Sequence, residues 1–296
     1  MKRWFLPFIA GIVCTVIAGG FIFPFLKLSR RHKKDKSDSN IIAPYYDKKA
    51  FQLSEDLKAK ATSSATINEK VKIPIIMYHY VEYVKDINDL IRKKLNINPA
   101  LFDGHLKGLK EAGYKTYFVK DVSDILDGKI NYSTQSAMLT FDDGYEDFYT
   151  DVFPLLKKYQ MKATMYIVYD FIGRKGFMNE EEIKEILASG LVELGSHTLD
   201  HLYLKYLPES TQRKQVIESK QKLEETFGIK VKTFAYPYGA FSEETVNFVK
   251  EAGYIAAVTV IPGMQQSKEN LFYISRVRPG IFTPQTIVKV IENYKK

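Results

Sequence analysis

Two short segments of the chain hold residue types that could bind a metal and hydrolyse a bond. Asp142 and Asp143 are adjacent in the sequence TFDDG. His197 and His201 are four residues apart in SHTLDH. Asp143 and the two histidines offer one carboxylate and two imidazoles, a three-ligand set with an open position, which is typical of catalytic rather than structural metal sites. Asp142 is left beside that metal, where a general base is needed. These residues predict a metal-dependent hydrolase.

The backbone must turn sharply at both segments to bring these side chains together. Successive strand residues point to opposite faces, so Asp142 and Asp143 cannot both face one pocket from a regular strand. We therefore expect the strand to end there, and Gly144 permits the turn. A helical turn would place His197 and His201 on one face, because residues four apart are neighbours on a helix.

From residue 73 onwards, short apolar runs alternate with amphipathic segments. The predicted strands are 73–78, 115–118, 136–141, 162–167, 191–194, 232–235, 255–260 and 272–275, and the predicted helices are 100–112, 122–126, 145–159, 179–189, 208–227, 243–252 and 284–294. This alternation predicts an α/β fold whose parallel sheet is closed or nearly closed into a barrel. In such folds the chemistry occurs at the carboxyl ends of strands, where Asp142, Asp143, His197 and residues 236–239 (YPYG) all fall.

The charge of the chain is concentrated at its start. The whole sequence has 43 Lys and Arg against 35 Asp and Glu, a formal net charge of +8. Residues 1–36 hold eight of the basic residues and one acid, which leaves 35 basic and 34 acidic residues for the remainder. Because the remainder is nearly neutral, nucleic-acid binding by it is unsupported. The single cysteine, Cys14, excludes an intrachain disulfide.

The start of the chain has the composition of a membrane segment followed by a stalk. Residues 4–26 carry no charged side chain, and a mainly apolar run of 23 residues can cross ~30 Å of hydrocarbon. A secretory signal peptide cleaved near Ala18 and a retained single-pass anchor are both compatible with this run. We favour the anchor, because the apolar run continues to Leu26. We expect residues 1–36 to be the anchor with its basic flank, 37–72 a polar stalk, and 73–296 one domain.

The motifs together resemble those of the NodB-like polysaccharide deacetylases (carbohydrate esterase family 4). The TFDDG segment resembles the first motif of that family, and His197 and His201 match the two histidines of its second. Residues 235–239 (AYPYG) resemble the third motif. The resemblance covers roughly residues 72–294. It implies a distorted (β/α)7 barrel and the removal of N-acetyl, less often O-acetyl, groups from glycans that contain N-acetylglucosamine.

The resemblance also implies a role for each matched residue. Asp143, His197 and His201 would hold one divalent metal; this ligand set suits Zn²⁺, with Mn²⁺, Co²⁺ or Ni²⁺ as alternatives. Asp142 would be the general base. The backbone N–H of Tyr238 would hold the oxyanion. Tyr236 and Pro237 belong to the same loop of the third motif and are further candidates for substrate binding.

The chain departs from the family pattern at three places. No histidine follows His201, so the late Leu-x-His motif that supplies the general acid is absent. His79, at the end of the first barrel strand in the sequence MYH, could supply the acid instead. This opening resembles the branch that acts on poly-N-acetylglucosamine. An Arg that hydrogen-bonds the base in many relatives is replaced by Lys232 or Thr233, and Arg276, or alternatively Arg278, could take its place.

Sugar binding must also differ from the family, because the only Trp is Trp4, in the apolar run. Stacking on sugar rings would then fall to tyrosine or phenylalanine, and Tyr203, Tyr236 and Phe241 are the candidates.

We therefore expect a membrane-anchored glycan deacetylase with its domain outside the cytoplasm. The basic flank at 27–36 conflicts with this orientation, because the positive-inside rule would place that flank in the cytoplasm. The favoured substrate is a poly-N-acetylglucosamine exopolysaccharide, with peptidoglycan next. Two alternatives remain open: a carbohydrate-binding protein with a relict site, and a cytoplasmic hydrolase of a small acetylated metabolite. No protein partner is indicated.

Overall fold

The computed structural model describes residues 70–86, 88–279 and 287–295. The anchor expected at residues 4–26 and almost all of the expected stalk lie outside these ranges. Within them, no helix combines the length and apolar character needed to cross a bilayer.

Seven parallel strands form a nearly closed barrel. In order around the sheet they are β2 (Ile75–Tyr78), β6 (Ser136–Phe141), β7 (Ala163–Ile167), β8 (Val192–Ser196), β9 (Thr233–Ala235), β10 (Ala256–Pro262) and β12 (Ile274–Arg276). Val277, directly after β12, returns to the first strand. Its carbonyl accepts from Met77 N at 2.9 Å, and its N–H donates to Ile75 O at 2.7 Å. The predicted α/β barrel is confirmed, and the arrangement fits the expected (β/α)7 fold.

An eighth parallel strand, β5 (Lys115–Tyr117), lies beside the barrel. It pairs with the first half of β6, Ser136 to Met138. Strand β2 pairs with the second half, from Met138 to Phe141. One edge of β6 is thus shared between two neighbours.

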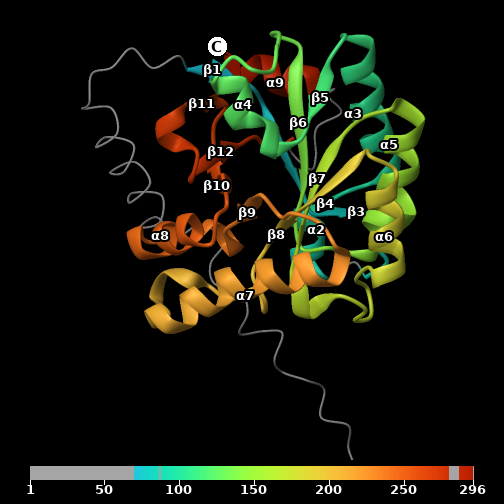
Figure 1. Ribbon diagram of the computed structural model, residues 1–296. Coiled ribbons are helices and arrows are strands. Elements are labelled where there is room, and N and C mark those ends of the chain that lie inside the picture. Colours follow the sequence, from blue (N-terminus) through green and yellow to red (C-terminus); the bar gives the residue numbers. More distant parts are fainter. Residues whose placement is uncertain (1–69, 87, 280–286, 296) are drawn as a thin grey trace, which may run out of the picture. The chain divides into compact units, whose positions relative to one another are not determined.

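Helices surround the strands, and most of them cover the outside of the barrel (Figure 1). They are α2 (Leu90–Leu95), α3 (Pro99–Glu111), α4 (Val122–Leu126), α5 (Phe153–Tyr159), α6 (Glu180–Ala188), α7 (Glu209–Phe227), α8 (Glu243–Glu251) and α9 (Ile287–Lys295). The predicted strands and helices agree with these bounds to within a few residues. The helix expected over 145–159 is continuous over 146–159, but it contains an unexpected π-helical segment, η3 (Phe148–Val152), before α5. Pro154 lies in the first turn of α5, where its missing N–H and fixed φ are tolerated.

Several short elements carry too little pattern to be predicted. They are β1 (Val71–Lys72), β3 (Tyr80–Val81), β4 (Asn96–Ile97), β11 (Gln265–Gln266), helix α2, and the 3₁₀ turns η2 (Val119–Asp121), η4 (Tyr169–Phe171), η5 (Leu204–Tyr206), η6 (Pro237–Gly239) and η7 (Lys268–Asn270).

The strand side chains divide between two apolar clusters. Leu139 and Phe141 of β6 pack outward against the helices. Met138 belongs to the inner cluster, which also contains Tyr166 of β7. The alternation follows the two-residue period of a strand. Buried residues of α4, such as Ile125, join the inner cluster, so the barrel interior is a filled core rather than a channel.

Gly195→Ala is expected to destabilise this interior. A Cβ at Gly195 would lie 2.3 Å from Cε1 of Tyr166, whose side chain is fully buried. Such overpacking costs about 1–3 kcal/mol, measurable by urea unfolding. The control is Gly104→Ala in α3, where nothing lies within 4 Å of the added Cβ and better helix propensity should stabilise by about 0.5–1 kcal/mol. An unchanged stability of Gly195→Ala would contradict the close packing.

Candidate active site

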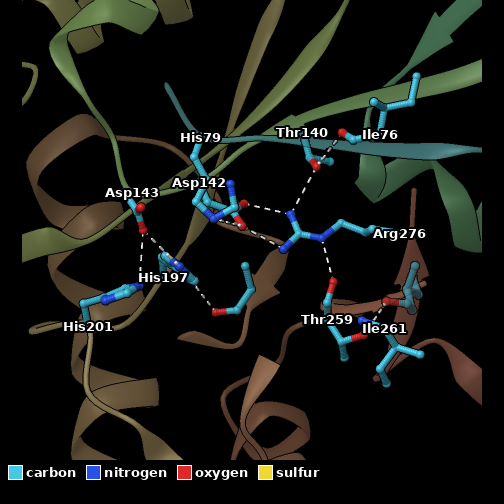
Figure 2. A network of polar contacts seen from close by, with 12 residues as sticks. Ile76, His79, Thr140, Asp142, Asp143, His197, His201, Thr259, Ile261 and Arg276 are labelled. Carbon is cyan, nitrogen blue, oxygen red and sulfur yellow. Dashed lines mark hydrogen bonds and ion pairs between the residues drawn. The ribbon is translucent and has the colours of Figure 1, made fainter. Parts of the chain in front are cut away.

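The turn after β6 sends two adjacent carboxylates in different directions. Strand β6 ends at Phe141, as expected, and the backbone then enters the left-handed region at Asp143 (φ 77°) and Gly144 (φ 86°). A Cβ on Gly144 would lie 2.9 Å from Cδ1 of Ile167, so space as well as φ favours glycine there. Asp142 points towards the barrel interior and Asp143 towards the two histidines (Figure 2).

The loop after β8 carries both histidines, but not on a helical turn as the spacing suggested. Thr198 (φ 72°) and His201 (φ 58°) are both left-handed, and residues 197–203 are not helical. The Thr198 hydroxyl accepts from His201 N at 3.0 Å. Gln215 of α7 accepts from two further backbone N–H groups of the loop. Side-chain hydrogen bonds, rather than a helix, therefore bring His197 and His201 together.

Asp143, His197 and His201 converge on one point. Their ligand atoms all lie within 4.8 Å of one another. Asp143 Oδ1 is 3.4 Å from Nε2 of His197 and 3.2 Å from Nε2 of His201. The other ring nitrogens are occupied: Nδ1 of His197 donates to Ala235 O at 2.7 Å, and Nδ1 of His201 lies 3.2 Å from the Tyr238 hydroxyl. Such outer contacts orient histidines that ligate a metal.

These residues fit a divalent cation. Asp143 Oδ1 is buried and accepts no hydrogen bond of good geometry from the described residues, although two imidazole nitrogens face it. Burial by itself raises the pKa of Asp143, but His201 and His197 outweigh it and hold the pKa well below its usual range. An ionised carboxylate with two imidazole nitrogens is a donor set that suits Zn²⁺.

Asp142 forms a buried ion pair with Arg276. The guanidinium donates to both carboxylate oxygens, at 2.8 and 2.7 Å, and both side chains are at most 2% exposed. Arg276 is itself held by Thr259 O at 2.7 Å and by the Thr140 hydroxyl at 3.1 Å (Figure 2). Burial raises the pKa of Asp142, but the charge of Arg276 outweighs it, so the pKa lies below its usual value. Asp142 is therefore a carboxylate at neutral pH.

His79 lies next to this pair, directly after β2. Its Nε2 is 3.8 Å from Oδ2 of Asp142, and its side chain is 12% exposed. Burial lowers the pKa of His79 to about 4, although both neighbouring aspartates act in the opposite direction. At rest the imidazole is therefore neutral.

The YPYG loop after β9 places its two tyrosines in different environments. Tyr238 (φ 59°) brings its ring to His201, with ring centroids 4.6 Å apart. Gly239 (φ 68°) has no room for a side chain, because a Cβ would lie 2.5 Å from Val260. Tyr236 is fully buried, and its hydroxyl donates to Phe272 O at 2.9 Å. Pro237 is also buried.

Two of the three residues expected to stack on sugars are therefore part of the core. Tyr236 packs on Phe241, which is 1% exposed, so neither ring presents a face to a ligand. Tyr203 is half-buried and stacks between Tyr238 and Tyr206. The ring contacts of Tyr238 and the hydrogen bond from Arg276 to Thr140 have no signal in the sequence, although both residues lie inside recognised motifs.

Adding zinc to the metal-free protein is expected to raise its Tm. A cation that binds only the folded state stabilises it by ~4 kcal/mol at 1,000 times its Kd. Asp143→Ala and His201→Ala should each remove most of the shift in calorimetry, whereas Glu180→Ala, an exposed carboxylate on α6, should keep it. A zinc shift in Asp143→Ala as large as in the unmodified protein would contradict this site.

Comparisons with known proteins agree with this geometry. A family model described as polysaccharide deacetylase matches residues 129–257. A protein of Bacillus subtilis (strain 168) named "Putative polysaccharide deacetylase YxkH" is 34% identical over 238 residues, which cover 79% of this chain and 81% of that protein. The poly-beta-1,6-N-acetyl-D-glucosamine N-deacetylase of Staphylococcus aureus (strain MSSA476) is 26% identical over 235 residues, 75% of this chain and 80% of that one.

A solved structure shares the fold. The Streptococcus pyogenes deacetylase PplD, in complex with acetate, superposes with a TM-score of 0.67 at 26% identity and covers 77% of this chain and all of its own. The Bacillus subtilis relative is matched over most of its length at more than 30% identity. The chain therefore belongs to the polysaccharide deacetylase family, NodB-like hydrolases that cleave amide bonds.

Proposed function

We propose that this protein removes N-acetyl groups from a polysaccharide of N-acetylglucosamine, using one divalent cation, with Zn²⁺ favoured over Mn²⁺, Co²⁺ or Ni²⁺. The observation that carries the proposal is the Asp142 carboxylate, which Arg276 keeps ionised next to the cluster of Asp143, His197 and His201. A base beside a three-ligand cation site is the arrangement that hydrolysis of an amide needs.

Residues of this chain have separate roles in the first half of the reaction, in which water attacks the acetyl carbonyl. A bound cation would supply Lewis acidity, polarising the acetyl carbonyl and lowering the pKa of a water. Asp142 accepts the proton of the attacking water as general base. Arg276 keeps Asp142 ionised and fixes the direction of its two oxygens. The backbone N–H of Tyr238, on the loop that lies against His201, donates to the oxyanion.

His79 acts in the second half of the reaction, in which the amine leaves. Its neutral imidazole, 3.8 Å from Asp142, can take up the proton that Asp142 has accepted. The protonated imidazole then donates to the leaving nitrogen as the C–N bond breaks, which yields acetate and a free amine and restores both side chains. A low resting pKa suits this task, because such an imidazolium releases its proton readily.

Poly-N-acetylglucosamine exopolysaccharide is the favoured substrate, and peptidoglycan is the second choice. Two observations support this order. The sequence MYH at the end of the first barrel strand, β2, places His79 at the site, and the name of the Staphylococcus aureus relative states that glycan. A relict carbohydrate-binding site is not favoured, because Asp143, His197 and His201 converge and Asp142 is paired with Arg276 next to them.

We also propose that residues 4–26 anchor the protein in the cell membrane, with the deacetylase domain outside the cytoplasm. The support is the uncharged apolar run followed by a polar stalk. Cleavage near Ala18, which would release the protein, is the alternative. Protease digestion of intact cells distinguishes an outer from a cytoplasmic domain.

A panel of three glycans tests the proposed function. Acetate release is measured on β-1,6-linked N-acetylglucosamine pentamer, peptidoglycan and chitin oligomers, with the metal content of the same sample determined in parallel. We expect acetate from the pentamer in proportion to bound metal, and less from the other two. Metal-loaded protein that releases no acetate from any of them would overturn the proposal.

A further inference from the structure

We propose that Tyr203, Tyr206 and Tyr238 form a tyrosine ledge that binds the sugar units next to the one being deacetylated. This inference rests on the proposed function, because the ledge starts at the active site. It adds two residues, Tyr203 and Tyr206, that make the enzyme prefer a polymer over a short saccharide.

The three rings continue outward from a metal-site histidine. Tyr238 lies against His201, with ring centroids 4.6 Å apart and its hydroxyl 3.2 Å from Nδ1. Tyr203 stacks on Tyr238 at 6.1 Å with an interplanar angle of 28°. Tyr206 stacks on Tyr203 at 5.6 Å and 17°. The series therefore leads from the active site to the solvent-exposed ring of Tyr206.

Part of the ledge is exposed to solvent. Parallel aromatic rings in contact prefer an offset arrangement, and separations of 5.6–6.1 Å are compatible with one. Exposure also increases along the ledge. Tyr203 is half-buried, and Tyr206 at its end is 66% exposed. Leu202, 36% exposed, belongs to the same loop.

Single exposed apolar side chains on a surface need no explanation, but a continuous aromatic series that begins at an active site does. Tyr206 is much more exposed than aromatic side chains nearby: Tyr236 and Phe241, on the loop after the neighbouring strand, are both buried. The loop that carries Tyr203 and Tyr206 begins at His201 itself, so its position is fixed by the same turn that forms the metal site.

A neutral pyranose is the ligand that fits this surface. A β-linked sugar presents C–H groups on its flat faces and hydroxyl or acetamido groups at its edges. Tyrosine combines an apolar face with a hydroxyl that hydrogen-bonds at its rim. Aromatic faces with polar tips therefore match both parts of an N-acetylglucosamine unit, and stacking demands no charge on it.

The test compares substrates of two lengths. We measure kcat/KM for acetate release from the β-1,6-linked N-acetylglucosamine dimer and pentamer. Tyr206→Ala should lower the value for the pentamer about tenfold, equivalent to ~1.4 kcal/mol, and that for the dimer less than about twofold. Tyr206→Phe, which keeps the ring, should retain most of the pentamer activity. Tyr203→Ala should resemble Tyr206→Ala.

Tyr132→Ala is the matched control. Tyr132 is 43% exposed and precedes β6, at the end of the strands opposite to the catalytic groups. Its removal should change neither substrate. Isothermal titration of the pentamer against the inactive Asp142→Asn protein adds a readout without turnover, in which Tyr206→Ala should weaken binding about tenfold.

The outcomes separate the two proposals. If the unmodified protein deacetylates both oligomers and Tyr206→Ala changes both equally, or neither, the ledge is overturned and the proposed function stands. If the unmodified protein releases acetate from neither oligomer, the ledge is overturned, and the proposed function fails with it only if peptidoglycan and chitin oligomers also yield no acetate. Unfolding curves of each variant verify that the fold is intact, as the exposure of Tyr206 leads us to expect.

Discussion

Asp142→Asn is expected to lower the rate of acetate release about 10³-fold, within the range that a positioned general base contributes. The substitution keeps the size of the side chain and removes the charge that accepts the proton from water. Asp142 is not among the three converging ligands, so bound metal should be unchanged. The measurement is kcat on the pentamer with zinc content determined on the same sample.

The control for this variant is Asp103→Asn. Asp103 is a surface carboxylate on α3 paired with Lys158, and its loss should not affect the rate. An Asp142→Asn protein with full zinc and an undiminished rate would show that another group is the base. A variant that had lost its zinc would place Asp142 among the ligands instead.

Arg276→Met is expected to reduce both stability and activity. It leaves the Asp142 carboxylate buried without its partner, and breaking a buried pair in this way costs about 3–5 kcal/mol. The pair stabilises the fold above the unfolded-state pKa of Asp142, and this stabilisation is lost as pH falls through the lower folded-state pKa. Without Arg276 the pKa of Asp142 rises, so the acidic limb of the rate profile should move to higher pH.

Two comparisons isolate the cause of that loss. Adding Asp142→Asn to Arg276→Met removes the unpaired charge, so stability should recover in part while the rate stays low. Arg213→Met breaks an exposed pair with Glu251 and should cost no more than about 1 kcal/mol. Urea unfolding and kcat/KM against pH are the measurements. An unchanged acidic limb in Arg276→Met would contradict the role given to Arg276.

The barrel could be predicted because its elements follow local rules. Strands of this sheet are buried on both faces, so they occur as short apolar runs, and the strand predicted over 136–141 has the bounds of β6. Errors occurred where a local signal was overridden or absent. The π-helical turn within the helix expected over 145–159 has no local signal, and strands of two residues such as β3 show no periodicity at all.

The residues of the candidate site could be predicted from the sequence, but the conformation of the loops that carry them could not. The motif spacing singled out Asp142, Asp143, His197 and His201, because few other patterns place these residue types at strand ends. The loop of the two histidines is shaped by the distant Gln215, which no local pattern reveals.

Contacts across the barrel were equally hidden in the sequence. Arg276 is 134 residues from Asp142 and 136 residues from Thr140 along the chain. It reaches both only because the last strand of the barrel returns to the first. Tyr236 was expected to meet sugars because of its motif, but its ring packs into the core. Motif membership did not distinguish this buried tyrosine from Tyr238, which lies at the site.

Diffraction from zinc-loaded crystals, recorded on both sides of the zinc absorption edge, tests the central claim most directly. The account predicts one anomalous peak, ~2.0–2.2 Å from a carboxylate oxygen of Asp143 and from Nε2 of His197 and His201, with Asp142 still paired to Arg276 beside it. A zinc-saturated protein whose only peak lies away from these three residues would contradict it.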